Sequence, residues 1–145
     1  MLHINQSSLD QMLADAERSF PDECCGFFFG TEDGDQRFVK EVLVVDNSKE
    51  GDKRRRFEIA PKDYLKAEAF AEEKGLQFLG VYHSHPNSPA IPSAYDRMAA
   101  QPYFSYIIIS VFDGEFSHIR SWQLNDDMQF EIENINNKLF IHQIK

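Results

Sequence analysis

The chain has 145 residues, of which 42% are hydrophobic, including 13 Phe and five Tyr. This length and composition suffice for one domain with a hydrophobic core, and they exclude two ordinary domains or an intrinsically disordered chain. The formal net charge of −9 repels nucleic-acid phosphates and anionic lipid surfaces, so neither nucleic acid nor a membrane is an expected partner.

The first part of the chain predicts a helix followed by a β-hairpin. Apolar residues recur at helical spacing over residues 8–20, a Ser8–Gln11 pair resembles a capping box, and Pro21 ends the pattern. The apolar segments 25–30 and 38–45 flank an Asp-Gly turn signal, which is typical of two antiparallel strands.

The middle of the chain predicts a strand, a helix and a second strand. Residues 55–59 are predicted as a short strand, and Pro61 can occupy the first turn of a helix that ends near Lys74, with Gly75 as its C-terminal cap. The apolar run 76–83 then predicts a buried strand, and a proline-rich loop follows it.

The last part predicts a short helix over residues 93–101 and two strands, 106–112 and 115–124, that flank another Asp-Gly turn. Residues 128–133 fit one more strand, whereas the tail 134–145 fits a strand, a helix or a frayed end equally well. Helices and strands that interleave without a linker or an internal repeat predict a single α/β or α+β domain.

The first residues, the longest apolar stretch and the cysteines predict the cellular compartment. Residues 1–6 lack a basic segment followed by an apolar run, so no secretory signal is expected, and the apolar stretch 104–112 is far shorter than the roughly 20 residues of a membrane-spanning helix. Cys24 and Cys25 are adjacent and could pair only as a strained vicinal disulfide, which favours a reducing cytoplasm. Two cysteines also exclude a four-thiolate zinc site.

Metal-binding residue types cluster after the buried strand. His83 and His85 are two apart on a predicted strand, so both imidazoles point to one side and can bind one ion. A catalytic zinc site needs one further carboxylate or thiolate, which Asp96 can supply. Ser93 and Asp96 are three apart at a predicted helix start and so share one face, which the proline-rich loop can turn back toward the histidines. Each pattern has an ordinary reading too, since Ser-x-x-Asp resembles a capping box and His-x-His occurs in strands by chance.

The combination of these patterns is more specific than either one. The run His83-Ser84-His85-Pro86, the loop to Pro92, and Ser93-x-x-Asp96 together resemble the signature of the JAMM or MPN-plus family of zinc metallopeptidases. The segment 23–30, which begins with Glu23, resembles the bacterial form of the element that carries the family's catalytic glutamate. The resemblance extends over about the first four-fifths of the chain.

The resemblance implies a zinc ion held by His83, His85 and Asp96, with Glu23 as the general base that activates water and returns the proton to the departing amine. It also implies that Ser93 donates a hydrogen bond to the oxyanion. For Glu23 the alternative is a solvated carboxylate after a turn. Strand alternation turns Ser84 away from the metal, which favours a packing role.

The family fold implies a single domain over residues 1–145, with the tail uncertain, built as a mixed, curved β-sheet flanked by helices in a cytidine-deaminase-like architecture. The implied reaction is hydrolysis of an amide or isopeptide bond after the C-terminal tail of a ubiquitin-like or sulfur-carrier protein. The alternative is a non-catalytic MPN-type scaffold. The basic run 53–56 either docks an acidic substrate or is a solvated loop, and the oligomeric state is left open.

Overall fold

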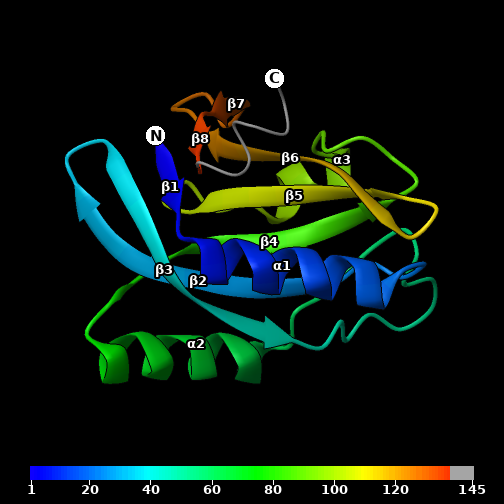
Figure 1. Ribbon diagram of the computed structural model, residues 1–145, viewed down its shortest axis with the longest axis horizontal. Helices are drawn as coiled ribbons and strands as arrows, with labels where there is room; N and C mark the ends of the chain where they lie inside the picture. The colour runs from blue at the N-terminus through cyan, green and yellow to red at the C-terminus, as the bar shows by residue number, and fades with distance from the viewer. Residues whose placement is uncertain (138–145) are drawn as a thin grey trace.

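The computed structural model describes residues 1–137, which form three helices and one eight-stranded sheet (Figure 1). In chain order the elements are β1 (Leu2–Ile4), α1 (Gln6–Ser19), β2 (Cys25–Asp33), β3 (Gln36–Val45), α2 (Pro61–Lys74), β4 (Gln77–Pro86), α3 (Ala94–Ala99), β5 (Ser105–Phe112), β6 (Glu115–Leu124), β7 (Phe130–Glu133) and β8 (Ile135–Asn136). None of the helices within 1–137 has the length and apolar character needed to cross a bilayer.

The sheet has the strand order β7-β6-β5-β4-β2-β3-β1-β8 and is mixed. Strands β4 and β5 run parallel, as do β1 with β3 and β1 with β8, whereas the remaining neighbours are antiparallel. Helix α1 crosses in front of the sheet in Figure 1, and α2 lies below β2 in the same view. This arrangement confirms the predicted mixed sheet with flanking helices.

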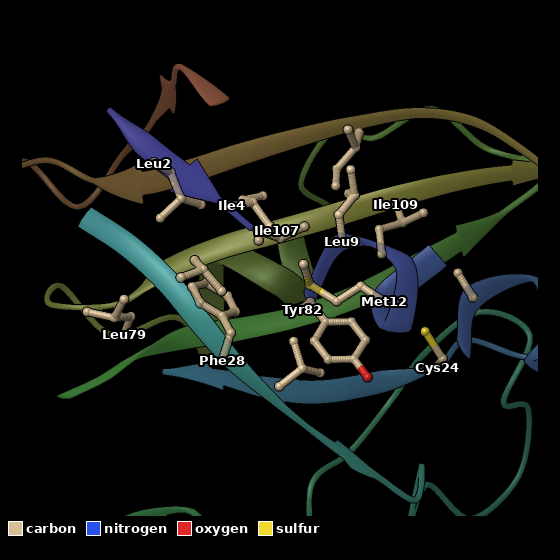
Figure 2. Packing of buried hydrophobic residues seen from close by; sticks show 14 of the residues in the cluster. Leu2, Ile4, Leu9, Met12, Cys24, Phe28, Leu79, Tyr82, Ile107 and Ile109 are labelled. Carbon is tan, nitrogen blue, oxygen red and sulfur yellow. The ribbon is translucent and has the colours of Figure 1, made fainter. Parts of the chain in front are cut away.

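Two hydrophobic cores cover the two faces of the sheet, because side chains alternate along each strand. Phe28 of β2 and Tyr82 of β4 belong to the core beneath α1 (Figure 2), together with Met12 of that helix. Their neighbours Phe27 and Val81 belong to the opposite core, which α2 covers. Consecutive residues of β4 therefore contribute their side chains to opposite cores in turn.

Helix α1 is fixed to the sheet by one buried tyrosine. The Tyr82 hydroxyl donates to Asp15 Oδ2 at 2.7 Å, and both residues are buried. The Tyr82 ring lies directly over Gly26 of β2, where an added Cβ would come within 2.3 Å of it. Glycine is therefore required at position 26 for the tyrosine to reach the helix.

The start of α1 corrects one expectation. Asn5, and not Ser8, is the N-cap, because the Asn5 side chain accepts a hydrogen bond from the Ser8 amide at 3.0 Å. The helix thus begins at Gln6, and Gln11 donates to Ser7 instead of completing a capping box. The predicted Ser8–Gln11 capping box is wrong because a second capping residue lies three positions upstream.

The strand predicted over 55–59 is also wrong. The segment is irregular, and the Asn47 side chain takes the place of a neighbouring strand. Its amide nitrogen donates to the Arg56 carbonyl at 3.1 Å, and its oxygen accepts from the Glu58 amide at 3.1 Å. These polar groups are thereby satisfied without a ladder.

Most other predicted elements are confirmed. Both hairpins form, and α2 begins at Pro61 and ends at Lys74, followed by Gly75, whose φ of 66° is the left-handed cap conformation. The helix predicted over 93–101 forms only as the shorter α3. Of the open tail, Ile135–Asn136 form β8, and residues 138–145 lie outside the described part.

A buried arginine ties β3 to the strands at the centre of the sheet. The Arg37 guanidinium donates to the carbonyls of Leu79 and Tyr103 at 3.2 and 2.7 Å, and to Ser105 Oγ at 2.9 Å. Its Nε lies 3.1 Å from the Glu32 carboxylate. Only 8% of Arg37 is exposed, so its removal takes a donor away from each of these acceptors in a buried place.

We expect Arg37→Met to lower the free energy of unfolding by about 2–4 kcal/mol, because the apolar side chain fills the space but satisfies none of these acceptors. Urea unfolding followed by circular dichroism measures the change. Arg120→Met, at an exposed position on β6, is the matched control and should change stability by less than about 0.5 kcal/mol. Equal effects of the two substitutions would contradict the structural role of Arg37.

Candidate metal centre

Two histidines converge at the end of β4. His83 and His85 point to the same face of the strand, and their Nε2 atoms lie 3.1 Å apart. Ser84 points to the opposite face, where its hydroxyl accepts a hydrogen bond from the Cys24 amide at 2.8 Å. The structure therefore confirms that the two histidines lie on one face of the strand and Ser84 on the other. The Ser84 hydroxyl anchors the start of β2.

Asp96 joins the histidines from α3. Its Oδ2 atom lies 3.3 Å from His83 Nε2 and 3.2 Å from His85 Nε2. The same oxygen accepts the Ser93 amide at 2.9 Å, while Ser93 Oγ accepts the Asp96 amide at 3.0 Å. The capping box and the cluster with the histidines thus coexist, because one carboxylate oxygen serves both.

The three donor atoms fit a tetrahedral zinc ion. Ligand atoms at about 2.0–2.1 Å from such an ion are separated by about 3.3 Å, close to the 3.1–3.3 Å between these atoms. His85 Nδ1 lies 2.8 Å from the Pro89 carbonyl, which can only accept, so Nδ1 carries the proton and Nε2 keeps its lone pair for a metal. Two imidazole nitrogens and one carboxylate form a donor set that zinc prefers.

His83 is the most enclosed of the three residues. Its ring stacks on Phe57, with 4.5 Å between ring centroids, and its Nδ1 is buried without a hydrogen-bond partner among the described residues. Burial lowers the pKa of His83 despite the neighbouring Asp96 carboxylate, which favours the neutral imidazole that binds metals.

Asp96 is held in its charged form. Burial by itself would raise its pKa, but His83, His85 and the Ser93 amide together hold the pKa of Asp96 well below its usual range. A carboxylate that is charged at neutral pH beside two imidazoles attracts a cation.

Sheet register brings Glu23 to this cluster. Cys25 pairs with His83 across β2 and β4, so the residue two positions before the β2 strand lies beside the end of β4. One carboxylate oxygen of Glu23 lies within 4.8 Å of donor nitrogens of His83 and His85. Glu23 is only 6% exposed, and burial raises its pKa to about 8, although His85 and Arg56 oppose the rise.

Sequence reasoning missed the residues that support Glu23 from behind. Its amide donates to the Lys53 carbonyl at 2.7 Å, and its carbonyl accepts from Asn47 Nδ2 at 3.0 Å. Asn47 also holds the backbone of Arg56, so it connects Glu23 to the basic loop. No local pattern signals this, because an Asn after a strand is also an ordinary turn residue.

A second support was also missed, at the loop between β4 and α3. The Ala90 amide donates to His118 Nε2 at 3.0 Å, and the Ala90 carbonyl accepts from Trp122 Nε1 at 3.1 Å. Both side chains belong to β6, and they fix the loop whose Pro89 carbonyl orients His85. Trp122 therefore supports the cluster through this loop.

Comparison with known proteins identifies the family of the chain. The family described as prokaryotic homologs of the JAB domain matches residues 5–125, most of the chain and every residue of the cluster. The chain belongs to this prokaryotic JAB family. The resemblance of the sequence to JAMM or MPN-plus proteins is thereby confirmed.

Two named relatives illustrate the prokaryotic JAB family. The chain is 33% identical to a desampylase of Pyrococcus furiosus over 106 residues, which cover 72% of this chain and 68% of that protein. It is 28% identical to the CysO-cysteine peptidase of Mycobacterium tuberculosis over 127 residues, which cover 87% and 84% of the two chains. Proteins similar to this chain thus carry the names of hydrolases.

Solved structures show the same fold. A protein of Desulfitobacterium hafniense, solved in solution, superposes with a TM-score of 0.82 and 33% identity, covering 94% of this chain and 92% of its own. A JAB1/MPN domain protein from Archaeoglobus fulgidus, only 17% identical, superposes with a TM-score of 0.56 over 94% of this chain and all of its own. The second likeness supports the fold alone.

Proposed function

We propose that this prokaryotic JAB protein is a zinc-dependent peptidase that hydrolyses the amide or isopeptide bond after the C-terminal tail of a ubiquitin-like or sulfur-carrier protein. The observation that carries the proposal is the convergence of three donor atoms, from His83, His85 and Asp96, beside the buried carboxylate of Glu23. The names of the relatives, a desampylase and a CysO-cysteine peptidase, support the reaction class.

Each residue has a proposed role. His83, His85 and Asp96 would hold the ion, which when bound supplies Lewis acidity and lowers the pKa of a coordinated water to about 7. Glu23 accepts the proton of the attacking water and returns it to the departing amine. A pKa near neutrality suits both steps, and a cation beside Glu23 draws its pKa down from about 8.

Ser93 is the proposed oxyanion donor. Its Oγ accepts a hydrogen bond from the Asp96 amide, so the hydroxyl proton is directed elsewhere, and the residue is exposed beside His85 and Glu23 in one cleft. A donor placed there can stabilise the carbonyl oxygen as the carbon becomes tetrahedral.

The cellular compartment and the domain extent of the enzyme are also proposed. We place it in a reducing cytoplasm as one domain over residues 1–145, and the free, buried state of Cys24 and Cys25 supports the reducing compartment. A non-catalytic scaffold is the rival function. A scaffold does not need the full donor set or a buried glutamate beside it, and this chain has both.

The proposal predicts metal-dependent loss of a C-terminal extension. Zinc-loaded protein should release a residue placed after the terminal Gly-Gly of a ubiquitin-like sulfur carrier, and protein stripped by a chelator should not. Intact mass spectrometry of the carrier measures the loss. Bound zinc without any cleavage across a panel of carriers and lysine conjugates would favour the scaffold.

A further inference from the structure

A small cleft opens beside the cluster on the side of Glu23. It has a volume of about 220 Å³, and Glu23, His85 and Ser93 line it together with two arginines, Arg54 and Arg55. These arginines come from the irregular loop between β3 and α2, whose backbone is anchored to Glu23. Two cations thus border the site of the proposed proton transfer.

A second hollow borders the cluster at Asp96 and shares no lining residue with this cleft. It has a volume of about 300 Å³ and is lined by Asp96 and by aromatic residues, among them Phe57, Tyr64 and Tyr95, but not by Glu23. If Glu23 protonates the departing amine, as the proposed function requires, the leaving group occupies the cleft that Glu23 lines together with His85 and Ser93. The acyl side of the substrate then lies toward the aromatic hollow.

The two arginines are oriented but not neutralised. Arg54 Nε lies 3.3 Å and Arg55 Nε lies 3.7 Å from the two oxygens of Asp52, and the side chains are 68% and 86% exposed. One carboxylate thus holds two guanidinium groups by Nε, which leaves their terminal nitrogens as donors. Arg56, in contrast, stacks its guanidinium over the Tyr95 ring at 4.6 Å.

An anion in this cleft requires such cations. The cleft contains the Glu23 carboxyl group, Asp96 lies beside it, and the whole chain has a net charge of −9, so a free carboxylate is repelled unless local positive charge compensates. Guanidinium groups are well suited to bind a carboxylate because their planar N–H groups match its two oxygens.

We infer that Arg54 and Arg55 bind the α-carboxylate of a single amino acid that leaves as the amine product. In a C-terminal residue the carboxylate carbon lies only about 2.5 Å from the scissile nitrogen, so both fit one small cleft. The volume is below the roughly 300–1,000 Å³ of drug-sized ligand sites, which suits one residue. A lysine isopeptide bond presents no carboxylate at this place.

The inference rests on the proposed function and names its substrate class: a carrier protein extended by one amino acid, in preference to a lysine conjugate. The reaction adds water across the amide, so the carrier gains a terminal carboxylate and the amino acid leaves with its amine and its own carboxylate. The protein is then a processing carboxypeptidase.

The test compares two substrates that differ in one group. A sulfur carrier extended past Gly-Gly by alanine is compared with the same protein ending in alaninamide, and kcat/KM is measured by intact mass spectrometry. The unmutated protein should prefer the free carboxylate by about 10- to 100-fold, the effect of one or two charge-assisted hydrogen bonds. Arg54→Gln/Arg55→Gln should lose this preference, because kcat/KM for the free carboxylate falls toward that for the amide.

A double variant with the same loss of charge is the control. Lys40→Gln/Arg120→Gln removes two exposed cations from β3 and β6 and should keep the preference. Equal cleavage of both substrates by the unmutated protein would overturn the inference alone. Equal slowing of both substrates by the arginine variant would overturn it too, because the arginines would then bind the carrier protein and not the carboxylate. Cleavage of a lysine conjugate of the carrier but of neither extended carrier would overturn the inference alone, and cleavage of none of the three would overturn the proposed function and the inference with it.

Discussion

Replacing Glu23 by glutamine is expected to lower kcat for release of the C-terminal extension by about 10²- to 10⁴-fold, because the amide cannot accept the proton of the attacking water. The shape of the side chain is kept, so the fold and the metal content should not change. Intact mass spectrometry gives the rate, and atomic emission after dialysis gives the zinc content.

The same variant separates two donor sets. Glu23, His83 and His85 also have ligand atoms within 4.8 Å of one another, so a site that uses Glu23 in place of Asp96 is conceivable from distance alone. Retained zinc in Glu23→Gln, with lost zinc in Asp96→Asn, supports the proposed roles. The reverse pattern would make Glu23 a ligand and remove it as the base.

Glu68→Gln is the matched control for this experiment. Glu68 is exposed on α2, and its replacement removes the same charge without touching the cluster. Its activity should equal that of the unmutated protein. Activity of Glu23→Gln above about one-tenth of that level would contradict the general-base role.

Loss of one histidine should abolish zinc binding. We expect His83→Ala to fall from about one zinc per chain to none after dialysis at neutral pH, because two protein ligands hold the ion too weakly. Zinc at 100-fold above its dissociation constant should stabilise the unmutated protein by about 2.7 kcal/mol and should not stabilise the variant. Thermal unfolding with and without zinc measures this difference.

A buried histidine also contributes to stability when no zinc is bound. His83 is buried, so its replacement lowers stability in the absence of zinc as well, and only the zinc-dependent shift is diagnostic. His3→Ala, a change in a histidine of β1 away from the cluster, should keep the full shift. A zinc-dependent shift in His83→Ala equal to that of the unmutated protein would exclude His83 as a ligand.

Local patterns predicted the elements well wherever the deciding interactions are themselves local. Helix α2 begins at Pro61 because proline lacks an amide proton, and it ends at Lys74 because Gly75 adopts the left-handed cap conformation. The strand at 55–59 was predicted wrongly because composition does not show whether a neighbouring strand exists, and the Asn47 side chain occupies that place. The start of α1 was misplaced because Asn5 and Ser8 are both good caps, and only the folded chain chooses between them.

The sequence alone determined that His83 and His85 share one side of a strand and that Asp96 follows at the start of a helix, because both depend on spacing within a few residues. Only the tertiary structure decided that Glu23 meets them, through the pairing of Cys25 with His83 across β2 and β4. It also decided that Arg54 and Arg55 border the same cleft. Such contacts join segments far apart along the chain, and their registers depend on packing that no local pattern encodes.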